Sequence, residues 1–242
     1  MTLHVDLAVP ERALAIGAHS DDIEFGCGAT LAKWSAAGCE VHLLVCTDGS
    51  KGTWDADEDL AALVATRRDE QQAAAAALSA RDVHFLDVVD GELSDDRVLR
   101  GRVCETIRRT RPDVVLGHDP WKRYRLHPDH RWAGLLTVDA IVAARDPHFF
   151  AQQPFAPHRP RHALLFEPDE VNHVERLDVN HVDAKIDALL CHRSQWRSTM
   201  GIHDDPVNER AAFTRTQREA AAGTGVRVGA PYAEAFARID DL

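Results

Sequence analysis

The sequence lacks the features that mark secreted, membrane-spanning and disulfide-stabilised chains. Its five cysteines are odd in number and form no CxxC pair, which predicts small buried side chains in a reducing compartment. No run approaches the roughly 18 apolar residues of a membrane-spanning helix. The first residues, MTLHVDLAVPERALAIG, show no basic segment before a long apolar one, so we expect no signal peptide. Together these absences predict a soluble, cytoplasmic protein.

Basic residues are scarce as well. The chain carries 28 Lys and Arg against 39 Asp and Glu, a net charge of −11. Nucleic acids and anionic membranes bind positively charged surfaces, so we expect neither as a partner. The 14 histidines, in contrast, exceed what an ordinary core needs and suggest metal ligands or proton-transfer groups. A length of 242 residues suits one large domain, and we expect a single domain over residues 1–242.

Apolar strand-like runs alternate with helix-like runs along the chain. We expect strands at 12–18, 40–47, 83–87, 112–118 and 163–168, and helices at 28–38, 60–80, 97–110, 131–145 and 182–192. This alternation predicts a Rossmann-like, doubly wound α/β fold, with a mostly parallel sheet and helices on both faces. In the strand order 3-2-1-4-5, the first and fourth strands are neighbours where the order reverses. Ligands bind outside the carboxyl ends of strands at such a point.

Unusual polar clusters follow these two strands. The first is AHSDDIE at 18–24, and the second is HPDH at 127–130. His19 and Asp22 are three residues apart, so a tight turn can bring them together, and a histidine of HPDH would complete two histidines and one carboxylate. Zinc with open positions uses such a set, as does non-haem iron(II). Asp21 would face elsewhere and could act as a base toward water that the cation activates.

Each cluster also has an ordinary structural explanation. Asp21 or Asp22 could cap the following helix, and the HPDH histidines could be solvated loop residues. The GCG at 26–28 lacks the third glycine of a dinucleotide fingerprint and is interpreted as close helix–strand packing. TDGSKGT at 47–53 lacks the spacing of a P-loop and is interpreted as an active-site rim. Two clusters at the ends of neighbouring strands favour one joint site.

Several of these segments resemble the motifs of a known family. AHSDDIEFGCGATLAKW resembles the AHPDDE signature of the LmbE/PIG-L family of zinc-dependent N-acetylglucosaminyl deacetylases, and HPDH resembles its second metal motif. The similarity continues through RRDEQQAAAAAL, DGEL, KIDALLCHRSQ and PYAEAF, and so covers nearly the whole chain. Two residues differ from the family's motifs, at positions that the resemblance places near the substrate. Ser20 replaces the proline of the signature, and Arg125 stands where some relatives carry a tyrosine, two residues before His127.

The resemblance implies a role for each matching residue. The implied metal ligands are His19, Asp22 and His130, the general base is Asp21, the oxyanion stabiliser or proton donor is His127, and the substrate contacts are Arg67 and Asp90. The implied cofactor is Zn²⁺, with Fe²⁺ as an alternative. The implied reaction is metal-dependent hydrolysis of an N-acetyl amide on a small-molecule amino sugar or glycoconjugate, which releases acetate and a free amine.

Two other functions are compatible with the same residues. A non-haem iron(II) oxygenase would use the same two histidines and carboxylate, but it also needs a site for a redox co-substrate. A non-catalytic binding module on this fold is the second alternative. A homo-oligomer is also compatible with the sequence, because Phe149, Phe150 and Phe155 in the proline-rich segment 146–162 could pack against a partner subunit.

Overall fold

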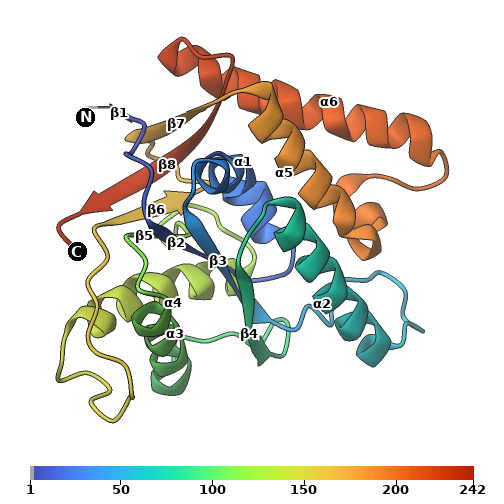
Figure 1. Cartoon of the computed structure of the whole chain (residues 1–242). Helices are drawn as coiled ribbons and strands as arrows, with labels where there is room; N and C mark the ends of the chain where they lie inside the picture. The colour runs from blue at the N-terminus through green and yellow to red at the C-terminus, as the bar shows by residue number, and fades with distance from the viewer. Residues whose placement is uncertain (1–2) are drawn as a thin grey trace.

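A computed structural model describes residues 3–242 and shows one continuous sheet between two layers of helices (Figure 1). The eight-stranded sheet has the order β1-β7-β8-β6-β5-β2-β3-β4. Its strands are β1 (His4–Val5), β2 (Arg12–Gly17), β3 (Glu40–Thr47), β4 (Asp82–Val88), β5 (Val114–His118), β6 (His162–Phe166), β7 (His173–Leu177) and β8 (Tyr232–Asp240). Within residues 3–242, only β8 runs antiparallel to its neighbours, β6 and β7. The expected mostly parallel sheet is therefore confirmed.

Helices cover both faces of this sheet, as a doubly wound fold requires. They are α1 (Asp22–Ala36), α2 (Leu60–Ala77), α3 (Arg97–Thr110), α4 (Pro128–Arg145), α5 (Val179–Cys191) and α6 (Pro206–Gly225). Helices α1, α2 and α5 pack together on one face, and α3 and α4 pack on the other (Figure 1). Helix α6 packs against β8 and α5. No helix within residues 3–242 combines the length and the apolar character needed to cross a lipid bilayer.

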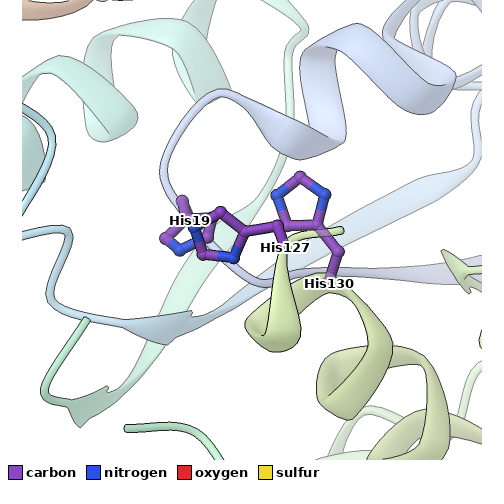
Figure 2. Close-up of side chains that lie close together, drawn as sticks. All are labelled: His19, His127 and His130. Carbon is purple, nitrogen blue, oxygen red and sulfur yellow. The ribbon is translucent and has the colours of Figure 1, made fainter. Parts of the chain in front are cut away.

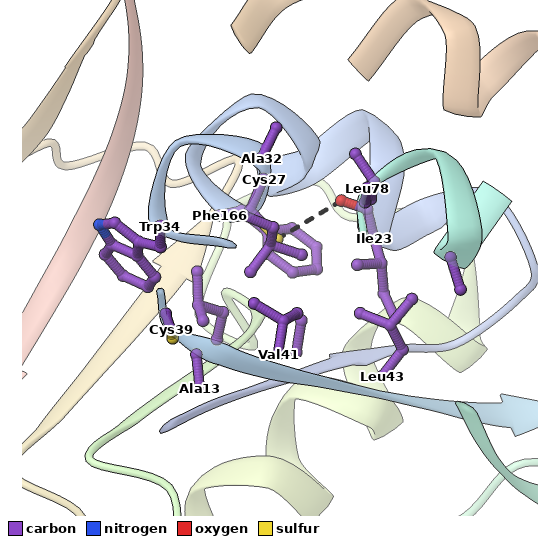
Figure 3. Close-up of a cluster of buried hydrophobic side chains, with 14 of the residues drawn as sticks. Ala13, Ile23, Cys27, Ala32, Trp34, Cys39, Val41, Leu43, Leu78 and Phe166 are labelled. Carbon is purple, nitrogen blue, oxygen red and sulfur yellow. Dashed lines mark hydrogen bonds between the residues drawn. The ribbon is translucent and has the colours of Figure 1, made fainter. Parts of the chain in front are cut away.

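The central strand β2 is buried on both sides, which explains its unbroken apolar sequence. Its odd-numbered residues Ala13 and Ala15 belong to the core under α1, whereas Leu14 and Ile16 belong to the core under α3 and α4. Figure 3 shows the first of these cores. Fully burying a side chain such as Leu14 stabilises the fold by roughly 1.5–3 kcal/mol. Removing such side chains would therefore loosen the sheet beneath the predicted site.

The GCG segment in α1 confirms the packing interpretation. A Cβ at Gly26 would lie 2.5 Å from Cδ2 of Phe166 in β6, and one at Gly28 would lie 3.2 Å from Cγ of Lys185 in α5. Side chains cannot approach so closely, so glycine at residue 26 lets the helix settle onto the sheet. The two glycines thus bring α1 close to β6 and α5.

Helices α2 and α3 start at the expected residues, whereas α1, α4 and α5 start at 22, 128 and 179, earlier than the expected 28, 131 and 182. Asp59, Asp96 and Asp178 precede α2, α3 and α5, and each side chain accepts backbone N–H groups of the first turn. Helix α4 starts with Pro128, earlier than the expected 131, because proline suits the first helical position. The HPDH motif is therefore not a loop. His127 is the N-cap of α4, and the first turn of the helix carries the rest of the motif.

The chain beyond residue 168 contains elements that the sequence pattern did not predict. Strands β7 and β8 and helix α6 all lie there. Helix α6 buries only Phe213 and Gly225, so it lacks the apolar stripe that marks most helices. Strand β8 alternates alanine with larger aromatic or charged residues, and its Glu234 is buried with Oε1 2.7 Å from Nζ of Lys185. A buried ion pair at such a position has no periodic signature.

The proline-rich segment 146–162 is held by the guanidinium of Arg108. This group donates hydrogen bonds to the carbonyls of Ala143, Ala144, Asp146, Phe149 and Phe150. The ring of Phe150 packs over Gly101, where an added Cβ would lie 3.0 Å from Cε1. Phe150 is therefore half-buried against α3, and the homo-oligomer stays a prediction. Phe149 is 43% exposed.

Candidate active site

All seven residues singled out from the sequence line one cavity of about 630 Å³: His19, Asp21, Asp22, Arg67, Asp90, His127 and His130. The cavity opens at the carboxyl ends of β2 and β5, which are parallel neighbours in the sheet. The strand order β4-β3-β2-β5-β6 is the expected order 3-2-1-4-5. The two polar clusters therefore meet at the point where the strand order reverses, as the sequence predicts.

Asp21 adopts a backbone conformation that is uncommon for a residue other than glycine. Its φ is +95°, and it precedes α1 as the N-cap residue, yet its side chain makes no capping hydrogen bond. Such a conformation costs on the order of 1–3 kcal/mol and persists only where the surroundings enforce it. The backbone N–H of Asp21 donates to Oε1 of Gln71 at 3.3 Å. Helix capping therefore does not explain Asp21.

Asp22 lies between the imidazoles of the two clusters. Its Oδ2 is 3.3 Å from Nδ1 of His19, and its Oδ1 is 3.2 Å from Nε2 of His130. One nitrogen from each of His19, His127 and His130 also lies within 4.8 Å of the others (Figure 2). The structure therefore brings together the two histidines and the carboxylate that the resemblance implies as metal ligands.

Two further carboxylates orient His19. Its Nε2 lies 3.2 Å from Asp90 and 3.2 Å from Asp129, on the far side of the ring from Nδ1. Asp129 is fully buried and also accepts the N–H groups of Gly91 and Leu93, at 2.6 and 3.2 Å. A carboxylate that takes the N–H of one ring nitrogen leaves the other free as a ligand, an arrangement typical of metal-binding histidines.

The carboxylates around His19 favour binding of a cation. Within residues 3–242, the only basic side chains that form ion pairs with Asp22, Asp90 and Asp129 are histidines. Burial opposes a positive charge on His19, but the three carboxylates outweigh it and raise the pKa of His19 well above its ordinary value. Carboxylates that stabilise an imidazolium would also stabilise a divalent ion. The imidazole and carboxylate donors present therefore fit a metal such as zinc or iron(II).

Arg67 lies beside Asp21, below the rim of the cavity. Its Nη2 donates to the carbonyl of Ser20 at 2.8 Å and lies 4.0 Å from Oδ1 of Asp21, and its Nη1 donates to the carbonyl of Gly49. A Cβ at Gly52 would overlap the guanidinium, so glycine at this part of the rim leaves room for Arg67 as it lies here. Burial raises the pKa of Asp21 to about 6, although the charge of Arg67 opposes the shift.

The rim segment 47–53 is anchored on both sides of the cavity. The backbone N–H of Lys51 donates to Oδ2 of Asp90 at 3.1 Å, and Nε2 of Gln195 donates to the carbonyl of Gly52 at 3.0 Å. The interpretation of this glycine-rich segment as an active-site rim is confirmed by its place in the cavity wall. Next to it, Trp54 is 89% exposed and also lines the cavity.

His127 caps α4 and at the same time faces the cavity. Its Nδ1 accepts the N–H of Asp129 at 3.3 Å, so the neutral ring carries its hydrogen on Nε2. Burial, together with the charges of His19 and His130, lowers the pKa of His127. The residue therefore presents a neutral N–H donor, which is the property needed to stabilise a developing oxyanion.

Two buried residues of this site are not among those predicted from the sequence. His118, the last residue of β5, is 1% exposed, and its Nε2 lies 3.2 Å from Oδ2 of Asp22. Asp129, within HPDH, holds His19 as described above. The position of His118 at the end of a predicted strand beside the first one was an available signal. The role of Asp129 depends on a contact across 110 residues and had no local signal.

Comparison with known proteins agrees with this geometry. Residues 14–141 match the PIG-L family, described as GlcNAc-PI de-N-acetylase. The chain is 34% identical to diacetylchitobiose deacetylase of Thermococcus kodakarensis, over 77% of this chain and 70% of that protein. It is 32% identical to 1D-myo-inositol 2-acetamido-2-deoxy-alpha-D-glucopyranoside deacetylase of Kineococcus radiotolerans, over 56% of this chain and 46% of that protein.

A solved structure shares the fold over almost the whole chain. N,N'-diacetylchitobiose deacetylase from Pyrococcus horikoshii superposes with a TM-score of 0.84 and 29% identity, covering 96% of this chain and 84% of that one. A relative named for another reaction, 4-oxalmesaconate hydratase of Pseudomonas putida, is 28% identical over 78% of this chain and 76% of its own length. The family match and the similarity to the Thermococcus enzyme settle the relationship. The chain belongs to the PIG-L family.

Proposed function

We propose that this protein is a metal-dependent deacetylase that hydrolyses an N-acyl amide, normally an N-acetyl amide, on an amino sugar or glycoconjugate. The observation that carries the proposal is Asp21. It is a buried carboxylate with a strained backbone and no capping role, beside a histidine–aspartate donor set in a cavity of about 630 Å³. Relatives named as deacetylases of N-acetylated sugars support the same reaction.

We assign the metal to His19, Asp22 and His130, with zinc as the proposed ion and iron(II) as the alternative. A divalent cation held there would supply Lewis-acid activation of water and of the amide oxygen. His19 is prepared for this task because Asp90 and Asp129 take its Nε2–H and leave Nδ1 on the side of Asp22. This set leaves open positions for water and substrate, as hydrolysis requires.

The proton transfers fall to Asp21 and His127. Asp21 accepts a proton from the attacking water and returns it to the departing nitrogen, so the amide C–N bond breaks as acetate and a free amine form. The Nε2–H of His127 donates a hydrogen bond to the oxyanion of the tetrahedral intermediate. Arg67 and Asp90, at the cavity wall, are proposed to contact the substrate. Arg67 also holds the carbonyl of Ser20 and so keeps Asp21 in place.

The other two functions predict different measurable products. An oxygenase with the same ligands consumes oxygen, and a binding module releases nothing. The hydratase among the relatives shows that membership of the family does not by itself decide the reaction. Buried Asp21 favours a hydrolase, because neither a binding module nor the ligand set of an oxygenase needs a base at that position.

The direct test is acetate release from N-acetylglucosamine, N,N'-diacetylchitobiose and N-acetylglucosaminyl-inositol. We expect the zinc-loaded protein to release acetate and primary amine in equal amounts from at least one of them, with no oxygen uptake. Acetate and amine are assayed separately, and oxygen is followed with an electrode. Oxygen consumption, or zinc-loaded protein that releases no acetate from any of these sugars, contradicts the proposal.

His127→Ala should lower kcat by about 10²-fold or more, the range for losing one donor to an oxyanion. Zinc content should stay at the wild-type value, because His127 is not one of the assigned ligands. His127→Asp is the matched control for the N-cap, since aspartate also caps helices well but carries no N–H donor. Both variants should lose activity if His127 acts on the oxyanion. Normal kcat in His127→Asp would show that only the cap matters, and loss of zinc in His127→Ala would mean that His127 is a ligand.

A further inference from the structure

Arg125 occupies the position two residues before His127, but it does not enter the cavity. Its side chain is 5% exposed, and it is absent from the residues that line the cavity. The guanidinium Nη1 donates to Oε2 of Glu167 at 2.9 Å and approaches Nδ1 of His118 at 3.3 Å. Arg125 therefore does not act on substrate. Its polar contacts lead to His118.

The contact with Arg125 determines which nitrogen of His118 carries the hydrogen. A guanidinium only donates and does not lose its proton in proteins, so Nδ1 of His118 must accept. The neutral ring then carries its hydrogen on Nε2, which lies 3.2 Å from Oδ2 of Asp22. The N–H of Ala18 also points at this nitrogen, at 3.4 Å, so this tautomer places two donors against each other there. It is favoured because the carboxylate of Asp22 is both nearer and charged. His118 is thus a hydrogen-bond donor to Asp22.

This donation helps to orient the carboxylate of Asp22. Oδ2 accepts the backbone N–H of His19 at 2.7 Å and faces the Nε2–H of His118. Oδ1 is on the side of His130, whose Nε2 lies 3.2 Å away. Two donors on one oxygen restrain rotation of the side chain and keep the other oxygen facing His130.

We propose that Arg125 and His118 form a positioning pair for the metal site, in which Arg125 fixes the tautomer of His118 and His118 orients Asp22. The alternative is that His118 is itself a ligand, since one of its nitrogens lies within 4.8 Å of ligand atoms of Asp22 and His130. Ligation through Nε2 would move the hydrogen to Nδ1, where it would face the N–H of Arg125. Two donors would then oppose each other 3.3 Å apart in a buried place, and one of them carries the full positive charge of the guanidinium, unlike the neutral N–H of Ala18 at Nε2.

The tautomer can be measured in the wild-type protein without any metal. In protein labelled with ¹⁵N-histidine, the imidazole nitrogens of His118 are assigned by comparison with His118→Gln. We expect the hydrogen on Nε2 in the wild type, and a loss of that preference in Arg125→Met. A hydrogen on Nδ1 in the metal-free wild type would overturn the proposal. This measurement does not depend on the proposed reaction or on the proposed metal.

Zinc affinity, measured by competition with a chelator, tests the consequence for the site. Arg125→Met and His118→Leu should weaken zinc binding by about 10–100-fold, the usual effect of losing an outer partner of a metal ligand. His118→Gln should bind within about 10-fold of wild type, because a glutamine amide can still donate to Asp22. Arg123→Met, which removes an exposed arginine of the same loop, is the matched control and should bind normally.

Two affinity results contradict the positioning pair. If His118→Gln loses zinc as completely as His130→Ala, His118 is a ligand. If Arg125→Met binds zinc as tightly as wild type while remaining folded by thermal unfolding, Arg125 does not act through His118. These zinc affinities are measured independently of acetate release. They can therefore be interpreted even if the proposed deacetylation fails.

Discussion

Removing the divalent ion should abolish acetate release, and adding zinc or iron(II) should restore it. His130→Ala should weaken zinc binding by more than about 100-fold, because it removes one of three ligands and not an outer partner, whose loss costs about 10–100-fold. The physical reason is that His19 and Asp22 alone leave most of the coordination sphere to water. Metal content is measured by elemental analysis, and affinity by chelator competition.

His148→Ala is a suitable control for this variant, since it removes an exposed histidine from the loop after α4. It should retain zinc and turnover, which would show that the loss in His130→Ala belongs to the site. Full activity in protein that elemental analysis shows to be free of metal would falsify the mechanism. Normal zinc affinity in His130→Ala would mean that another residue is the third ligand. The imidazoles nearest to His130 are those of His127 and His118.

The part of the fold that positions the site could be predicted because its strands are buried on both faces. Strands β2, β3 and β5 appear in the sequence as short apolar runs between helices, and that pattern has few topological solutions. Strands β7 and β8 escaped prediction for the opposite reason. Each carries a buried charged residue, Glu175 and Glu234, whose partner Lys33 or Lys185 lies on a helix distant in sequence. Local sequence patterns do not predict ion pairs between residues so far apart in the chain.

In the site, too, some residues can be predicted from local sequence and others depend on contacts between distant segments. His19 and Asp22 stand out because polar residues that directly follow a buried strand need a partner, and His130 stands out as part of the HPDH cluster. The contacts that prepare them do not stand out. Asp129 accepts two N–H groups from the segment after β4, and His118 lies opposite the start of α1, so their roles exist only after the sheet is assembled. Sequence spacing indicates which groups can meet, whereas tautomers and orientations follow from the folded contacts.

Asp21→Asn should lower kcat by about 10²–10⁴-fold while the protein stays folded and zinc-loaded. Asparagine has nearly the size and shape of aspartate and tolerates positive φ values, so it can keep the conformation at +95°. The hydrogen bond to Gln71 comes from the backbone N–H and survives the change. An amide cannot take up the proton of the attacking water, however. Steady-state kinetics and elemental analysis of the same preparation provide the measurement.

The contrast with two other aspartates makes this variant decisive. Asp22→Ala should lose zinc and activity together, because Asp22 is an assigned ligand. Asp59→Asn replaces a true cap, whose carboxylate accepts the N–H groups of Ala61 and Ala62, and should leave kcat almost unchanged because asparagine caps about as well. If Asp21→Asn behaves like Asp59→Asn, Asp21 is not the base. If it loses zinc like Asp22→Ala, Asp21 belongs to the metal site. Only retained zinc with a collapsed kcat makes Asp21 the group that receives the proton.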